Sequence, residues 1–100
     1  MTKHLLPLTF FLVSMVTVTT AQNFSATELT INRHVDGTLL TPNGIEHPPL
    51  VVFIAGSGPT DRDGNQAFMK NDMLKKLAES LSERGIATFR YDKRVVKQLR

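Results

Sequence analysis

An apolar run that leads directly into a glycine loop restricts the fold of this chain more than any other feature. The stretch "LVVFIAGSGPTDRDGN", Leu50 to Asn65, begins with continuous apolar residues and then changes to glycines, acids and amides. An apolar run without alternation is typical of a strand that is covered on both faces in a largely parallel sheet. The sequence therefore predicts a strand from Leu50 to Ala55 whose carboxyl end presents the loop.

A helix and a second strand are expected after this loop. Asn71 or Asp72 can cap the start of the helix, and Gly85 can end it in the left-handed region that glycine adopts. The apolar residues between these ends fall on one stripe and are expected in the core: Met73, Leu74, Leu77, Ala78 and Leu81. The run from Ile86 to Tyr91 predicts the next strand, which gives a βαβ unit with a right-handed crossover.

The residues before this unit predict a hairpin. Two strand-like runs between Glu28 and Pro42 flank Asp36-Gly37, which is a turn signal. The expected architecture is an α/β fold in which a hairpin is followed by strand, loop, helix and strand. Such a set of elements leaves an edge strand and one side of the sheet without cover. Even a complete domain of this size buries only about 60% of its unfolded surface, so we expect an incomplete domain.

The first 21 residues are predicted to be a secretory signal peptide. Lys3 and His4 precede a mainly apolar run from Leu5 to Val18, and small residues lead to an expected cut near Ala21-Gln22. The alternative is an uncleaved anchor, but the run is short for a membrane span, which needs roughly 20 residues. The chain has no cysteine for lipid attachment or a disulfide. We therefore expect residues 22–100 to be secreted or periplasmic, with no stable membrane anchor.

The glycine loop could hold a phosphate, a metal ion or a reacting oxygen. Neither phosphate-binding glycine motif is present, and Asp61 stands where G-x-G-x-x-G needs its third glycine. Asp61 to Asp72 spaces its oxygen side chains as in a calcium loop, but Gln66 and Asp72 replace the Gly and Glu of an EF-hand. Ser57 lies between glycines, yet a nucleophile elbow would need glycines in place of Ala55 and Pro59.

A fourth possibility uses the backbone of the loop. An acyl-transfer enzyme stabilises its oxyanion with preorganised N–H donors, and removal of one donor costs about 100- to 1000-fold in rate. Gly56 and Gly58 would let a substrate approach the main chain without obstruction by side chains. Ser57 would then contribute its N–H group and not its hydroxyl.

Two motifs, "GSGPTDRDGN" and "RYDKR", carry a resemblance to a known family. Together with the helix sequence between them, they resemble the N-terminal part of secreted bacterial α/β-hydrolases. The branch is the esterase and serine-aminopeptidase-like one that is related to dienelactone hydrolases. The resemblance is strongest from Thr38 to Arg94. It implies that Leu50 to Ala55 is the third strand of an α/β-hydrolase sheet, Met73 to Arg84 its first helix and Ile86 to Tyr91 its fourth strand.

The resemblance also implies a reaction and a role for the loop. The reaction is hydrolysis of a carboxylic ester, thioester or amide, without a cofactor or metal. One half of the oxyanion hole is implied at the N–H of Ser57, with Gly58 as the next choice. The residues that would brace the loop or rim the pocket are Gly56, Asp61, Arg62, Asp63 and Asn65. The catalytic serine, acid and histidine follow the fourth strand in this family, so we expect the chain alone to be inactive.

The resemblance stops abruptly after "RYDKR". The family continues with a glycine, another residue and a second glycine, whereas this chain has Val95 and Val96 and ends at Arg100. A frameshift, a premature stop or a broken gene model would each produce this pattern. The basic tail then needs no nucleic-acid partner to explain it. The alternative function is a small secreted binding module, in one version a calcium-binding one that uses Asp61 to Asp72.

Overall fold

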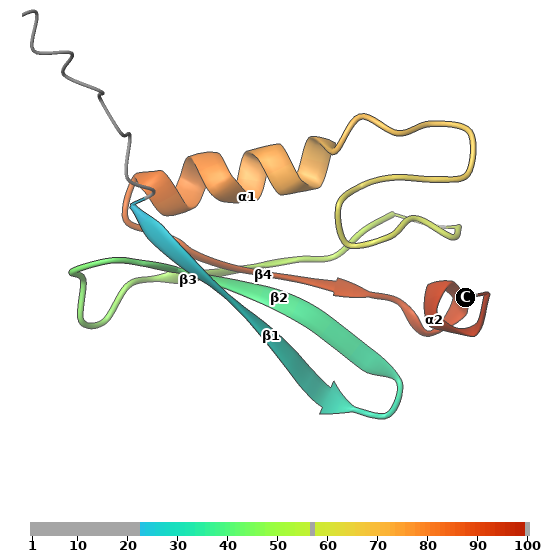
Figure 1. The fold of residues 1–100 in the computed structure, drawn as a ribbon, viewed down its shortest axis with the longest axis horizontal. Coiled ribbons are helices and arrows are strands. Elements are labelled where there is room, and N and C mark those ends of the chain that lie inside the picture. The colour runs from blue at the N-terminus through green and yellow to red at the C-terminus, as the bar shows by residue number, and fades with distance from the viewer. Residues whose placement is uncertain (1–22, 57, 100) are drawn as a thin grey trace, which may run out of the picture.

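The computed structural model describes residues 23–56 and 58–99, which form a small mixed sheet with two short helices (Figure 1). The predicted signal peptide lies outside these residues. The elements are, in chain order, β1 (Phe24–Asn32), β2 (Val35–Pro42), β3 (Leu50–Phe53), α1 (Met73–Glu83), β4 (Ala87–Asp92) and α2 (Arg94–Gln98). The sheet order is β1-β2-β4-β3, and β3 runs parallel to β4 while the other neighbouring strands are antiparallel. This arrangement is compatible with a partial α/β domain.

The hairpin is present, but its predicted turn is wrong. The chain turns at Arg33 and His34, and Asp36 and Gly37 lie inside β2. The side chain of Asn32 accepts a hydrogen bond from the N–H of His34 at 2.7 Å, which is a local turn contact typical of asparagine. Gly37 is needed for a different reason, because a β-carbon there would collide with the ring of Phe89 on β4. The glycine therefore serves close packing between strands.

One face of the sheet carries the core. The buried cluster contains Phe24, Leu40, Phe53 and Ala78, and Leu74 and Leu81 pack against it. Three of the five stripe residues thus contribute to the core as predicted, but Met73 and Leu77 are 59% and 49% exposed. The helix packs mainly on β4, β2 and β1, so the rest of its apolar stripe has no surface to be buried against.

The C-terminal end of α1 follows the prediction closely. The helix ends at Glu83, and Gly85 adopts the left-handed conformation with φ +90°. The N–H groups of Arg84 and Gly85 bond to carbonyls of the last helical turn, at 3.0 and 3.2 Å. The next strand then starts at Ala87, one residue later than predicted.

The strand before the glycine loop is much more exposed than predicted. It ends at Phe53, not at Ala55, and forms an edge of the sheet. Leu50 and Val52 are 55% and 49% exposed, whereas Phe53 is buried in the core cluster with Ala78 of α1. Figure 1 shows why: α1 covers one face of the sheet, and no described element covers the other. The continuous apolar run is therefore suited to a strand covered on both faces, and the described residues cover only one face of the sheet.

None of the helices in the two described ranges has the length and apolar character needed to cross a membrane.

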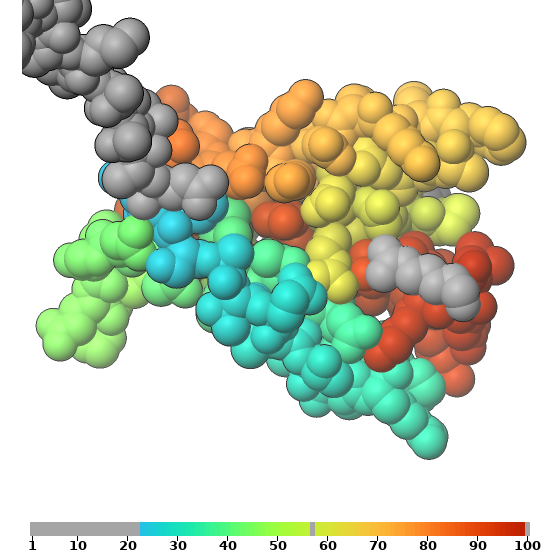
Figure 2. Space-filling model, viewed as in Figure 1, coloured from blue at the N-terminus to red at the C-terminus, as the bar shows by residue number. Residues whose placement is uncertain are grey.

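Figure 2 shows how the loop after the glycines packs. The loop that follows residue 57 (yellow) fills the space between α1 (orange) and the C-terminal segment (red).

We predict that the purified chain self-associates through β3 and that Val52→Lys weakens this association. An edge strand with exposed apolar side chains offers unpaired backbone groups to a second chain, and a lysine there opposes the pairing. Thr27→Lys is a matched control, because Thr27 and Val52 occupy opposite ends of one row across the sheet: Thr27, Leu39, Phe89 and Val52.

Sedimentation velocity over a concentration series measures the effect. The wild type and Thr27→Lys should associate to the same extent, and Val52→Lys should remain smaller at each concentration. Equal association of all three proteins would show that β3 is not the contact.

Candidate functional site

The glycine loop lies at the carboxyl ends of β3 and β4, beside the start of α1 (Figure 1). Gly56 and Gly58 are exposed, and Gly58 has φ +92°, which favours glycine. A β-carbon on Gly56 would meet no atom within 4 Å, and one on Gly58 would meet only the Gln66 side chain at 3.9 Å. The main chain is therefore open to approach at these positions. Ser57, the first predicted N–H donor, lies outside the described residues.

Asp61 and Asn65 brace the loop from within. One carboxylate oxygen of Asp61 accepts hydrogen bonds from the N–H groups of Asp63 and Asn65, both at 2.9 Å. The amide oxygen of Asn65 accepts from the N–H groups of Asn71 and Asp72, also at 2.9 Å. These bonds close the segment into a compact turn and satisfy backbone groups that would otherwise need water. Asp61 and Asn65 thus stabilise the backbone of this segment, and their place in a functional site stays a prediction.

The loop also caps α1, and of the two predicted capping side chains only Asn71 takes part: its amide oxygen accepts the N–H of Met73 at 3.1 Å. Asp72 occupies the N-cap position, but its side chain makes no capping hydrogen bond. Its carboxylate instead accepts from the side-chain amide of Asn65 at 2.6 Å. The backbone carbonyl of Asp63 accepts the N–H groups of Leu74 and Lys75 at 3.1 and 3.4 Å, and so satisfies donors of the first helical turn.

Arg62 ties the loop to three strands. Its Nε and Nη2 atoms donate to one carboxylate oxygen of Asp92 at 3.1 and 2.9 Å, and its backbone N–H donates to the other at 2.8 Å. Its Nη1 atom donates to Glu28 at 2.7 Å and to the hydroxyl of Thr38 at 2.8 Å. The Asp92 side chain is 1% exposed and that of Arg62 15%, so this is a buried ion pair. Paired, hydrogen-bonded charges are the form in which burial is tolerated.

Arg90 and Lys93 add two further ties between β4 and the loop. The buried guanidinium of Arg90 donates to Asp63 at 3.3 Å, while its Nε and Nη1 atoms have no hydrogen-bond partner in the described part of the chain. The ammonium of Lys93 donates to the carbonyl oxygens of Gly56 and Gly58. The two motifs are thus joined reciprocally: Arg62 of the first binds Asp92 of the second, and Asp63 of the first binds Arg90 of the second.

Three partners on the second motif are not predicted from the sequence: Arg90, Asp92 and Lys93. A signal was available, because residues two apart in a strand share a face. Arg90 and Asp92 therefore point the same way as Thr88, which lies under α1 against Ser82. Since a βαβ unit places the loop and helix over that face, these two charges had to meet the loop.

The hydrogen bonds around Arg62 shift the pKa values of Arg62 itself and of Glu28. Burial alone lowers the pKa of Arg62, but the hydrogen bonds to Asp92 and Glu28 outweigh burial and raise it. The hydrogen bond from Thr38, followed by that from Arg62, lowers the pKa of Glu28 below its ordinary value of 4.5. Both shifts favour the charged forms, so Arg62 and Glu28 are ionised at neutral pH.

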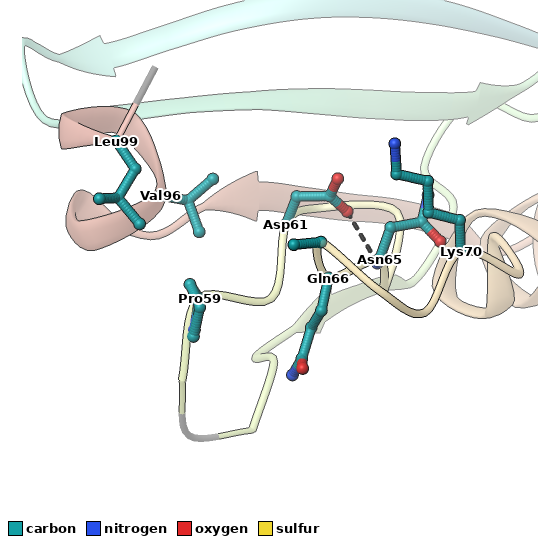
Figure 3. A pocket seen from close by; sticks show the side chains of 8 residues that line it. Pro59, Asp61, Asn65, Gln66, Lys70, Val96 and Leu99 are labelled. Carbon is teal, nitrogen blue, oxygen red and sulfur yellow. Dashed lines mark hydrogen bonds between the residues drawn. The ribbon is translucent and has the colours of Figure 1, made fainter.

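A hollow of about 510 Å³ opens between the loop and α2 (Figure 3). Its apolar lining comes from Pro59 and Ala67 on one side and from Val96 and Leu99 on the other, with Asp61 and Lys70 among the polar residues. The helix α2, which the sequence does not predict, buries Val96 and is held to β2 by an ion pair between Lys97 and Asp36 at 2.9 Å.

The described residues contain no group of three or more His, Cys, Asp or Glu side chains that could hold a metal ion. In the stretch proposed for calcium, Asp61 binds backbone N–H groups, Asp63 binds Arg90 and Asp72 binds the Asn65 amide. These contacts favour a structural role for the acids of the loop.

One comparison with known proteins gives a match. The chain is 36% identical to the esterase EstD of Thermotoga maritima over 73 residues, which cover 73% of this chain and 17% of the esterase. No family model matches the chain, and no solved structure matches it. The similarity supports a relationship to esterase-like hydrolases. The chain spans only about 17% of the length of this relative, which limits the comparison to the level of a hydrolase family.

We predict that Arg62→Met lowers the free energy of unfolding by about 3–5 kcal/mol, as expected when one partner of a buried ion pair is removed. The variant takes the guanidinium away from the buried carboxylate of Asp92. Arg84→Met removes the same charge from an exposed position at the end of α1 and should have little effect. Urea denaturation of the three proteins tests this. Equal midpoints for wild type and Arg62→Met would show that the network adds no stability.

The lowered pKa of Glu28 predicts a loss of stability in acid. Its carboxylate stabilises the fold above its unfolded pKa, and this contribution disappears as the pH falls through the lower folded pKa. Glu28→Gln should therefore lose less stability than wild type between about pH 5 and pH 3. Glu46→Gln, which removes a charge from an exposed loop, should behave as wild type does. Thermal unfolding monitored by circular dichroism at several pH values measures this, and identical curves for Glu28→Gln and wild type would contradict it.

Proposed function

We propose that residues 22–100 are the N-terminal part of a secreted serine hydrolase with an α/β-hydrolase fold, related to dienelactone hydrolases. The substrate is a carboxylic ester, thioester or amide, and the loop of Gly56, Ser57 and Gly58 supplies one half of the oxyanion hole. The observation that carries the proposal is the double tie of Arg62 to Asp92 and of Arg90 to Asp63, which holds the segment directly after this loop at the carboxyl ends of two parallel strands. The similarity to an esterase supports the same class.

The backbone donors of the loop suit this role. No hydrogen bond from the N–H of Gly56 or Gly58 is present within the described residues, and a substrate can approach the main chain there. Such donors accelerate a reaction only when they are held in place before charge develops. In this proposal Arg62 and Asp63 anchor to β4 the segment that follows these donors, and Asp61 and Asn65 brace that segment from within.

The proposal places the catalytic groups outside these 100 residues. In α/β-hydrolases the nucleophilic serine, the acid and the histidine follow one another in that order after the strand that β4 represents. The hydrolase therefore needs the sequence encoded beyond codon 100, and the chain alone contributes the oxyanion arm. The apolar N-terminal segment directs export, and cleavage near Ala21-Gln22 leaves no stable membrane anchor.

The test is to sequence the locus through codon 100 and to translate the following several hundred bases in all three forward frames. We expect a G-x-S-x-G segment followed by Asp or Glu and then His in one frame. The reconstructed protein should hydrolyse nitrophenyl acetate and be inhibited by a serine-directed phosphonate, and the 100-residue chain should do neither. Absence of the segment from every frame, or turnover by the short chain that the phosphonate inhibits, would overturn the proposal.

A further inference from the structure

Lys93 links the second motif directly to the glycine loop. It follows the last residue of β4 and is the N-cap residue of α2. Its ammonium group donates hydrogen bonds to the carbonyl oxygens of Gly56 and Gly58, the second at 3.2 Å. Among the described residues from Ile54 to Pro59, no other side-chain hydrogen bond is present. The ion pairs of Arg62 and Asp63 begin further along the chain, so they do not hold this part of the loop.

We propose that Lys93 is a positioning residue that orients the backbone donors of this loop, a role that rests on the proposed oxyanion function. A hydrogen bond from an ammonium to a carbonyl is charge-assisted and roughly twice as strong as one between neutral groups. The peptide unit that bears the N–H of Gly58 lies between the two carbonyls that Lys93 holds. Because each peptide unit is planar, holding the units on both sides leaves the N–H of Gly58 a single motion, the rotation of its own peptide unit between fixed neighbours.

The loop needs such a tether because of its glycines. Glycine loses more conformational freedom on folding than any other residue. Gly58 has a φ of +92°, and it has no side chain that would hold its backbone in this conformation. Among the described residues the Gly58 carbonyl otherwise accepts only the local N–H of Thr60, at 2.9 Å. Without Lys93 the N–H of Gly58 would therefore sample more directions, and a donor that must reorganise stabilises an oxyanion poorly. Lys93 acts from the carbonyl side of the main chain, so it orders the donor and leaves the N–H available.

Backbone dynamics of the ¹⁵N-labelled chain test the role of Lys93. We expect the order parameter of the Gly58 N–H to be typical of rigid backbone, about 0.85, in the wild type and to fall below about 0.6 in Lys93→Met. Lys93→Arg keeps the charge and the donors and should retain most of the order. Arg94→Met removes the neighbouring exposed charge and should resemble the wild type. Unchanged order at Gly58 in Lys93→Met, with the β-sheet amide signals intact, would overturn the inference.

A titration with methylphosphonate separates this inference from the proposed function. Methylphosphonate is a tetrahedral anion that probes for N–H donors able to bind an oxyanion. We expect it to shift the Gly58 amide signal of the wild type and of Lys93→Arg, and to shift that of Lys93→Met much less. No shift in the wild type counts against the oxyanion function, and the order parameters still decide whether Lys93 holds the loop. Equal shifts in the wild type and Lys93→Met would overturn the positioning role.

Discussion

The buried ion pair between Arg62 and Asp92 is the contact on which the candidate site depends. It joins a loop residue to the last residue of β4, and the same guanidinium reaches Glu28 on β1 and Thr38 on β2. Carboxylates and guanidinium groups are costly to bury alone, so each partner requires the other to be in place. The loop and the sheet are therefore coupled, and the loop does not need an apolar core of its own to be ordered.

This polar coupling matters because the apolar core is small. One face of the sheet is covered by α1 and the loop, but the other face and the edge at β3 present apolar side chains to solvent. A chain with so little buried apolar surface gains less from hydrophobic burial than a complete domain of the same class. The directional bonds of Arg62, Asp61 and Asn65 then carry an unusually large share of the local order.

The chemistry that this arrangement suits follows from what the loop leaves open. Its side chains are occupied with one another and with β4, whereas the backbone near Gly56 and Gly58 is exposed and unobstructed. A rigid loop with free N–H groups at the ends of parallel strands can stabilise a developing oxyanion without reorganisation. The similarity to an esterase supports a hydrolase family and no more, and the oxyanion role of the loop and the choice of its donors are our proposal.

The local elements whose signals lie within a few residues could be predicted from the sequence. The helix ended where Gly85 can adopt a left-handed conformation, and the βαβ unit followed from the apolar runs on either side of the loop. The groups that meet across the fold are seen only once the strands and the loop are packed together. Gly37 packs against an aromatic ring instead of forming a turn, β3 is exposed at an edge, and Lys93 reaches the loop from the end of β4. These outcomes depend on neighbours distant in sequence, and no local pattern states which neighbours a strand will have or which faces will remain uncovered.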